Sequence, residues 1–214
     1  MAKKVAEQLV DTLIEAGVRR IYAVTGDSLN EVNEAVRQNE AMKWIHVRHE
    51  ETGAYAAGAE AQLTGLPGCC AGSSGPGHVH LINGLYDAHR SGAPVIAIAS
   101  TIPTGEFGTE YFQETNTVKL FNDCSFYNEV ATPPEQFPRM LQSALQTATT
   151  RKGRSRTSRR PGKETGSQGR VLGTDLSACL VCLSGRRRPD TAGRDAQLLR
   201  TYHFVLRHRL QRGT

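Results

Sequence analysis

The stretch Val47-Arg48-His49-Glu50-Glu51 marks a change from strand to helix in this sequence. A short apolar run, 44–47, leads into it, and a longer run of mostly small residues, 52–59, follows it. A short apolar run followed by an alanine- and glycine-rich run is typical of a strand that ends where a helix begins. The sequence therefore predicts a carboxylate at the start of a helix.

That carboxylate has two interpretations. A glutamate in the first helical turn interacts favourably with the helix dipole and caps free N–H groups, a role that needs no ligand. The small residues after Glu50 favour a second role, because they let the helix pack close to neighbouring backbone, near the strand ends where open α/β sheets bind ligands. Glu50 and Glu51 point in different directions, so at most one faces a ligand. Glu50 is the candidate because it is nearer the strand.

Strand and helix patterns alternate along residues 1–150. Apolar runs predict strands at 21–24, 44–47, 69–71, 94–99 and 126–130. Helical periodicity predicts helices near 5–14, 29–37, 50–63, 77–90 and 134–148. Continuously apolar strands separated by helices are typical of a mainly parallel sheet with helices on both faces. We therefore expect an α/β domain over residues 1–153.

Glycine follows two of the predicted strands. Gly26 ends the first, and the loop 72–77 (GSSGPG) follows the third. A glycine-rich loop before a helix can bind phosphate, but this one has neither P-loop nor dinucleotide-binding spacing and no lysine to neutralise a phosphate. Packing against a flat group is the alternative. Together with Glu50 after the second strand, these positions predict a site for a neutral, flat, hydrogen-bonding ligand.

Charge is divided unevenly along the chain. Residues 1–150 hold 10 Lys and Arg against 17 Asp and Glu, a net charge of −7, whereas residues 151–214 hold 16 against 4, a net charge of +12. Beyond Gly153 only the short apolar runs 176–183 and 202–206 interrupt the polar sequence. We therefore expect residues 154–214 to be a disordered, arginine-rich tail without a specific nucleic-acid site.

The five cysteines and the hydropathy pattern limit the class of protein. The cysteines are scattered and odd in number, which argues against a disulfide framework. Cys179 and Cys182 form a lone CxxC pair without a second pair of ligands, so we expect no metal site. A membrane-spanning apolar run and a signal peptide are both absent, so we expect a soluble, cytoplasmic protein.

Six short motifs occur in the order of a known domain. They are 24–28 (VTGDS), 48–51 (RHEE), 57–61 (AGAEA), 75–77 (GPG), 81–87 (LINGLYD) and 111–114 (YFQE). Over residues 3–153 they resemble the N-terminal, pyrimidine-binding domain of thiamine-diphosphate enzymes. They are most similar to bacterial pyruvate oxidases and pyruvate:quinone dehydrogenases, chiefly through 85–87 (LYD). Acetolactate synthases share several of them, including 112–114 (FQE).

The resemblance implies a role for each matching residue. The residue that matches Glu50 hydrogen-bonds N1′ of the aminopyrimidine ring, which favours the imino form that removes the C2 proton before the cofactor attacks pyruvate. The implied cofactor-binding positions are Gly26, Asp27, Glu50, Pro76 and Gly77, and the implied substrate-side positions are Phe112 and Gln113.

The resemblance covers only part of the family's architecture. Full-length relatives carry an FAD-binding domain and a domain that binds the diphosphate and Mg²⁺, and neither has a counterpart here. Their sites lie between subunits of a dimer or tetramer, and peripheral membrane association involves a region that this chain lacks. We therefore expect a fragment that binds the pyrimidine half of thiamine diphosphate. The full-length relative would oxidatively decarboxylate pyruvate to acetate or acetyl phosphate, and this chain alone would be inactive. The alternatives are an acetolactate synthase-like carboligase fragment and a non-catalytic truncated product.

A one-base frameshift near Gly153 would explain the tail. Codons CGT-AGC-CGT-ACT-TCC-CGG-CGA-CCT encode residues 154–161, and dropping the first base gives Val-Ala-Val-Leu-Pro-Gly-Asp-Leu when the next codon begins with G. An apolar strand and a turn of this kind are what the family would have next. The codons are our choice, so they show that a frameshift is compatible with the sequence. On this hypothesis residues 154–214 should make few contacts with the sheet and carry little regular structure.

Overall fold

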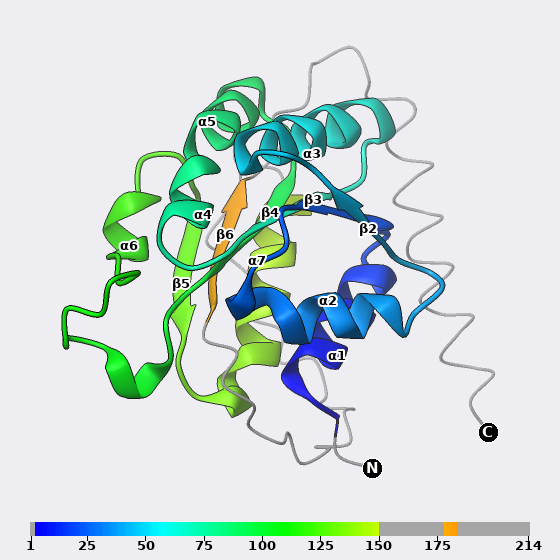
Figure 1. The fold of residues 1–214 in the computed structure, drawn as a ribbon. Coiled ribbons are helices and arrows are strands. Elements are labelled where there is room, and N and C mark those ends of the chain that lie inside the picture. The colour runs from blue at the N-terminus through cyan, green and yellow to red at the C-terminus, as the bar shows by residue number, and fades with distance from the viewer. Residues whose placement is uncertain (1–2, 150–177, 184–214) are drawn as a thin grey trace, which may run out of the picture.

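Six strands form one sheet in the order β2-β1-β3-β4-β6-β5 (Figure 1). The computed structural model of the chain describes residues 3–149 and 178–183. Its strands are β1 (Arg20–Ala23), β2 (Lys43–His46), β3 (Gly68–Gly72), β4 (Val95–Ser100), β5 (Tyr127–Ala131) and β6 (Ala178–Leu183). Each bound of the first five lies one residue from the bound predicted from the apolar runs.

The first four strands are parallel, and the order of the sheet changes direction at β1. Ile21 of β1 pairs with Trp44 of β2 on one side, and Ala23 of β1 pairs with Ala71 of β3 on the other. The chain therefore moves to opposite sides of β1 when it forms β2 and β3. In open α/β sheets, such a switch in strand order leaves a crevice at the carboxyl ends of the strands.

Helices cover both faces of the sheet, which confirms the predicted α/β architecture. Helices α3 and α5 cover one face, and α1, α2 and α7 cover the other (Figure 1). The bounds are α1 (Val5–Glu15), α2 (Asn30–Arg37), α3 (Glu50–Thr64), α4 (Pro76–His80), α5 (Ile82–Ser91), α6 (Thr117–Leu120) and α7 (Phe137–Thr149), with 3₁₀ turns η1 (Asp27–Leu29), η2 (Thr104–Glu106) and η3 (Pro134–Gln136).

The helix predicted over 77–90 is two helices in the structure. Helix α4 ends at His80 and α5 begins at Ile82, with Leu81 between them. The N–H of Leu81 donates to the carbonyl of His78, three residues back, instead of four. This tighter turn separates the two helices.

Alternate residues of the central strands supply the two halves of the core. Cys69 and Ile98 face α1, α2 and α7, whereas Cys70 and Ala97 face α3 and α5. Successive side chains of a strand point to opposite faces, so a strand buried on both faces must be apolar throughout. This explains why β3 and β4 show no polar alternation in the sequence.

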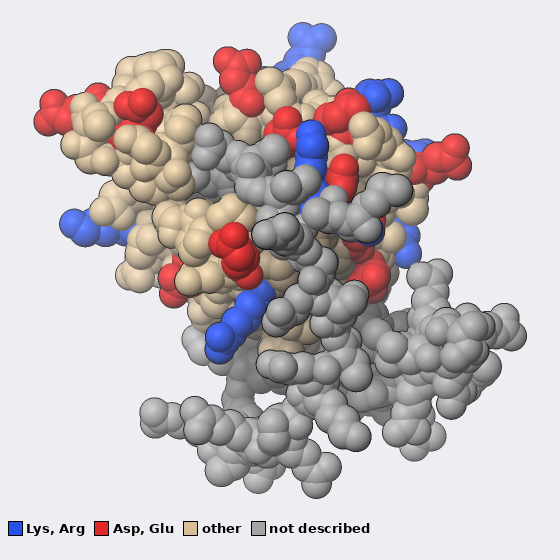
Figure 2. Space-filling model, turned by 90° about the horizontal axis from the view of Figure 1, so that it is seen from below, with Lys and Arg blue, Asp and Glu red and all other residues tan. Residues whose placement is uncertain are grey.

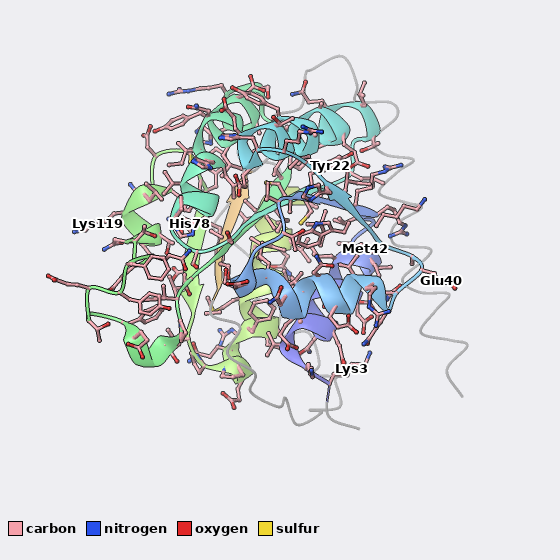
Figure 3. The ribbon with its side chains drawn as sticks, viewed as in Figure 1. Lys3, Tyr22, Glu40, Met42, His78 and Lys119 are labelled. Atoms are coloured by element: carbon pink, nitrogen blue, oxygen red, sulfur yellow. The ribbon has the colours of Figure 1, made fainter. Side chains whose placement is uncertain are left out.

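Small residues let α3 lie close to its neighbours, as the sequence predicts. A Cβ added at Gly84 of α5 would lie 2.6 Å from the Cβ of Ala54 in α3. A Cβ added at Gly53 would lie 3.0 Å from the carbonyl oxygen of Tyr22, which lies on β1 beneath α3 (Figure 3). Helix α3 therefore packs against the backbone of β1 and of α5.

Strand β6 corrects, for residues 178–183, the expectation that the tail 154–214 carries little regular structure and makes few contacts with the sheet. Residues 178–183 run antiparallel between β4 and β5, with Leu180 opposite Ile98 and Val181 opposite Asn128. The run ACLVCL is continuously apolar, as a central strand must be, and it pairs backbone groups that β4 and β5 would otherwise leave unpaired. Residues 150–177 and 184–214 lie outside the described residues, and so does the proposed frame change.

The outer surface of the described residues carries charges of both signs. Figure 2 shows Lys and Arg side chains interspersed with Asp and Glu where the described residues are visible on that face. Within residues 3–149 and 178–183, every helix is too short or too polar to cross a membrane.

Replacement of Gly84 by alanine tests the close packing of α3 and α5. The added methyl would meet Ala54 Cβ at 2.6 Å and the Tyr55 nitrogen at 2.8 Å. Overpacking costs about 1–3 kcal/mol, more than the roughly 0.5–1 kcal/mol that alanine contributes over glycine inside a helix. Gly84→Ala should therefore lower the free energy of unfolding, measured by urea denaturation.

Gly105→Ala is the matched control. A Cβ at Gly105 meets nothing within 4 Å, so the change should stay within about 0.5 kcal/mol of the parent chain. Equal stability of Gly84→Ala and Gly105→Ala would contradict the close approach of the two helices.

Candidate functional site

Three predicted site segments lie at the same edge of the sheet. Gly26 follows β1, Glu50 follows β2, and the loop 73–75 follows β3. Because these three strands are parallel neighbours, their carboxyl ends lie side by side at the point where the strand order changes direction.

Gly26 and Gly77 both lie against Ser73. A Cβ added at Gly26 would lie 2.5 Å from Ser73 Cβ, and a Cβ added at Gly77 would lie 2.5 Å from Ser73 Oγ. Real Cβ atoms do not approach this closely, so Gly26 requires glycine, whereas a Cβ at Gly77 would force the Ser73 hydroxyl to turn away. The end of β1 and the start of α4 thus both lie against the Ser73 side chain.

Glu50 lies beside this backbone surface and is only 8% exposed. Its Oε2 atom accepts a hydrogen bond from His80 Nδ1 at 3.0 Å. Its Oε1 atom faces Gly77, since a Cβ there would lie 3.3 Å from it. The burial of this carboxylate is offset by the His80 hydrogen bond and by the N-terminus of α3.

The start of α3 is capped by the residue before Glu50. His49 has extended backbone angles, φ −154° and ψ 136°, and its Nδ1 accepts the N–H of Glu51 at 3.3 Å. The Glu51 side chain instead accepts from Asn83 Nδ2 at 3.3 Å. The two glutamates therefore have different partners, as expected for side chains that point in different directions.

Hydrogen bonds between serines tie the strand ends together. Ser28 Oγ accepts the N–H of Ser74 at 3.0 Å, and the Ser28 carbonyl accepts from Ser100 Oγ at 2.9 Å. Ser74 Oγ lies 3.0 Å from Gln113 Oε1, to which it donates. The segments after β1, β3 and β4 and the loop that contains Gln113 are thereby held together.

His78 is the most deeply buried polar residue of this network. Its ring lies between α4 and the segment that leads to α6 (Figure 3), and its relative exposure is 0%. Nδ1 lies 2.8 Å from the Ser100 carbonyl oxygen, which can only accept, so we assign the proton to Nδ1. Nε2 then accepts from Thr115 Oγ1 at 2.5 Å. Burial lowers the pKa of His78, and the Ser100 carbonyl partly opposes this shift.

Comparison with known families agrees with this arrangement. Residues 3–120, more than half of the chain, match the family described as thiamine pyrophosphate enzyme, N-terminal TPP binding domain. The chain belongs to this family. The match includes the segments of Gly26, Glu50 and Gly77.

Several proteins of known sequence align with about two thirds of the chain. An uncharacterized 42.6 kDa protein of Pseudomonas amyloderamosa is 56% identical over 145 residues, 68% of this chain and 37% of that protein. Pyruvate oxidase of Lactiplantibacillus plantarum is 38% identical over 64% of this chain and 23% of that enzyme. The chloroplastic acetolactate synthase of Arabidopsis thaliana is 33% identical over 69% of this chain and 22% of that enzyme. The chain thus spans well under half the length of these relatives.

The structure brings some of the predicted site residues into contact and leaves the side chains of others exposed. Gly26 and Gly77 lie against Ser73, Glu50 lies beside Gly77, and Gln113 joins this group through Ser74. The other three predicted positions are exposed: Asp27 at the start of η1, Pro76 at the start of α4, and Phe112. Phe112 is 82% exposed and packs against Tyr111, with ring centroids 5.1 Å apart.

Sequence reasoning missed the two histidines that organise the site. His78 anchors the segment after β4, and His80 holds the Glu50 carboxylate. Their signal in the sequence is weak, since it consists of two polar residues just after the glycine-rich loop, on what reads as an ordinary helix. Only the pairing of segments far apart in the chain reveals their partners.

The pH dependence of stability tests the buried, neutral His78. In the unfolded chain His78 titrates near its ordinary pKa of about 6.5, while burial lowers its pKa in the folded chain. Below pH 6.5 the unfolded state therefore binds more protons, so stability falls as the pH drops toward the lowered pKa, by at most about 1.4 kcal/mol per pH unit. Urea denaturation between pH 8 and pH 5 measures this slope.

His78→Gln should flatten the slope, whatever its effect on stability at pH 8. His46→Gln is the control because His46 is exposed on β2, and this variant should keep the slope of the parent chain. Identical slopes for the two variants would rule out a buried neutral His78.

Proposed function

We propose that this thiamine pyrophosphate-binding domain holds the aminopyrimidine ring of thiamine diphosphate, with Glu50 hydrogen-bonded to N1′. The observation that carries the proposal is the position of Glu50 Oε1, which faces the glycine backbone at the edge of the switch in strand order. Family membership supports the cofactor, and the geometry supports the half of the cofactor that is bound.

The residues present fit a flat, weakly basic ring. A Cβ at Gly77 would lie 3.3 Å from Glu50 Oε1, so the absence of a side chain there leaves this oxygen accessible to a ring. Within the described part of the chain, Glu50 Oε2 is already bonded to His80, whereas Oε1 has no hydrogen-bond partner. One carboxylate oxygen is thus fixed and the other can bond a ring nitrogen.

The side chains around the ring have positioning roles on this proposal. Thiamine diphosphate, when bound, supplies the carbon nucleophile that attacks 2-oxo acids. Glu50 holds the proton shared with N1′, and His80 orients the Glu50 carboxylate. Gln113, held by Ser74, places the loop that precedes α6 beside the site.

We further propose that the parent enzyme oxidatively decarboxylates pyruvate, with FAD and Mg²⁺ bound by segments beyond this domain. The 38% identity to a pyruvate oxidase, against 33% to an acetolactate synthase, supports this over the carboligase alternative. An exposed Phe112 on the loop beside the site also suits a contact with a second subunit, which would complete the site in a homo-oligomer.

The unit that binds the cofactor is proposed to be residues 1–153, with a frame change near Gly153. The change in net charge supports this proposal, whereas strand β6, which lies beyond Gly153 and joins the sheet, counts against it. Sequencing the coding DNA tests it. The neighbouring frame, read onward from Gly153, should continue into flavin- and diphosphate-binding segments. An early stop in that frame would overturn the proposal.

Ligand-observed NMR tests the assignment of the ring to Glu50. Thiamine diphosphate added to the 214-residue chain should receive stronger saturation transfer at its pyrimidine protons than at its thiazolium side-chain protons, because only the pyrimidine half is in contact. Glu50→Gln should weaken this signal, since the amide is a poorer partner for a protonated nitrogen.

Glu51→Gln is the control, because Glu51 has a different partner. It should leave the transfer unchanged. Stronger transfer to the thiazolium side, or equal losses in the two variants, would refute the proposed orientation.

Proton exchange at the cofactor tests the catalytic part of the proposal. In a full-length enzyme that carries this domain, Glu50→Gln should slow exchange of the cofactor C2 proton by on the order of 10²–10⁴-fold, the usual contribution of general acid–base catalysis. The rate is measured by NMR on samples that have exchanged in D₂O for a set time and are then quenched with acid. Glu51→Gln should have a much smaller effect, and the reverse ranking would reassign the catalytic carboxylate.

A further inference from the structure

We propose that His49, Glu50 and His80 form a binding site for a divalent transition-metal ion of the zinc class. One ring nitrogen from each histidine and one carboxylate oxygen all lie within 4.8 Å of one another. Metal binding stands on this geometry alone, whereas the competition with the cofactor described below rests on the proposed function.

The three side chains converge because of the junction between β2 and α3. His49 is extended and Glu50 begins the helix, so these consecutive residues can point toward the same place. His80 is the last residue of α4, and its ring stacks on the ring of His49, with ring centroids 4.4 Å apart and ring planes inclined by 25°. Two segments separated by 30 positions in sequence therefore supply the ligands.

The distances need only a small contraction to bind an ion. Zinc–nitrogen and zinc–oxygen bonds of about 2.1 Å at tetrahedral angles place ligand atoms about 3.4 Å apart. The pair Glu50 Oε2 and His80 Nδ1 already lies at 3.0 Å. The histidine side chains are 48% and 43% exposed, so both can rotate toward a bound ion without disturbing the core.

The donor set selects the kind of ion. Two imidazole nitrogens and one carboxylate suit zinc and its neighbours, whereas Mg²⁺ and Ca²⁺ prefer oxygen ligands throughout. Three protein ligands leave a fourth tetrahedral position for water.

A second carboxylate strengthens the site. Glu51 Oε2 lies 3.8 Å from His49 Nδ1 and can accept its proton when Nε2 binds the ion. When His49 Nδ1 carries this proton it no longer accepts the hydrogen bond from the Glu51 N–H, a weak capping bond with an N···N distance of 3.3 Å. The positive end of α3 opposes a cation, but the carboxylates of Glu50 and Glu51 offset the charge of a divalent ion.

Metal and cofactor would compete for Glu50. An ion bound to the carboxylate withdraws it from the N1′ hydrogen bond, and both histidines must turn toward the ion. The site would thus make the domain sensitive to free zinc through the residue that the cofactor needs.

Cobalt and zinc titrations of the tag-free chain test the site. All chains titrated carry both Cys179→Ser and Cys182→Ser, because this CxxC pair would otherwise compete for the metal ion. Co²⁺ should bind at a ratio of one to one and produce visible d–d bands without the near-ultraviolet charge-transfer band of a thiolate. Zn²⁺ should displace it.

Loss of one ligand should weaken Zn²⁺ binding by at least about 10–100-fold, because even the outer partners of metal ligands contribute that much. We expect this for His49→Ala, for His80→Ala and for Glu50→Gln. His46→Ala removes an exposed histidine of β2 and should change nothing. Circular dichroism and urea midpoints identify any variant that is misfolded, and a titration of the folded parent with Mg²⁺ should show no displacement of Co²⁺.

The outcomes separate the metal proposal from the proposed function. Equal Zn²⁺ affinity in His46→Ala, His49→Ala and His80→Ala would overturn the metal site, and the role of His80 would then be the hydrogen bond to Glu50 alone. Competition is measured with thiamine, because a diphosphate would itself bind zinc. Zn²⁺ should reduce saturation transfer to the thiamine pyrimidine protons in the parent and not in His80→Ala. If Zn²⁺ does not change the saturation transfer to thiamine in the parent chain, the competition for Glu50 is overturned. The metal site and cofactor binding are then decided by the separate titrations described above.

Discussion

Close backbone packing around α3 is the constraint on which the site depends. A Cβ at Gly68 of β3 would lie 2.1 Å from the Ala57 carbonyl oxygen, and a Cβ at Gly53 would lie 3.0 Å from the Tyr22 carbonyl oxygen. Helix α3 is therefore pressed against β1 and β3 along its length. Because the helix cannot move outward, its first residue, Glu50, is held at the strand ends beside Gly77. Small residues thus fix the backbone position of Glu50, and the hydrogen bond from His80 then orients its carboxylate.

Much of this arrangement could be predicted from local sequence patterns. The strands follow from continuously apolar runs, and the positions of Gly26, Glu50 and Gly77 follow from strand ends in a parallel sheet. His80 could not be predicted in the same way, because its partner lies 30 residues earlier and only the fold brings them together. The same limit applies to His78, whose two hydrogen bonds reach residues 22 and 37 positions away.

Strand β6 shows where local patterns fail for a different reason. The apolar run 176–183 was visible in the sequence, but its isolation in a basic segment favoured a disordered interpretation. Whether a short apolar run forms a strand depends on whether a neighbouring sheet edge has backbone N–H and C=O groups free to pair with it. Strands β4 and β5, which are parallel to each other, have such groups on their facing edges, and β6 pairs antiparallel with both. An antiparallel strand needs no crossover helix, so strand formation here demands only apolar residues and sufficient chain length.

The balance of forces on Glu50 explains why one carboxylate suits both proposed ligands. Within the described residues its ion-pair partner is a histidine, with no Lys or Arg bridge to it. A hydrogen bond to a charged group contributes about 1.5–3 kcal/mol, and a helix N-terminus about 0.3–1 kcal/mol, against a desolvation penalty of several kcal/mol for a buried charge. These terms nearly cancel, so the carboxylate is held in place without being neutralised by a permanent cation. The Glu50 carboxylate is therefore stabilised by any partner that carries positive charge, either a protonated ring nitrogen or a metal ion. The exposed rings of His49 and His80 add the nitrogen ligands that the ion requires and that a pyrimidine does not. The choice between the two ligands therefore depends on these histidines rather than on Glu50.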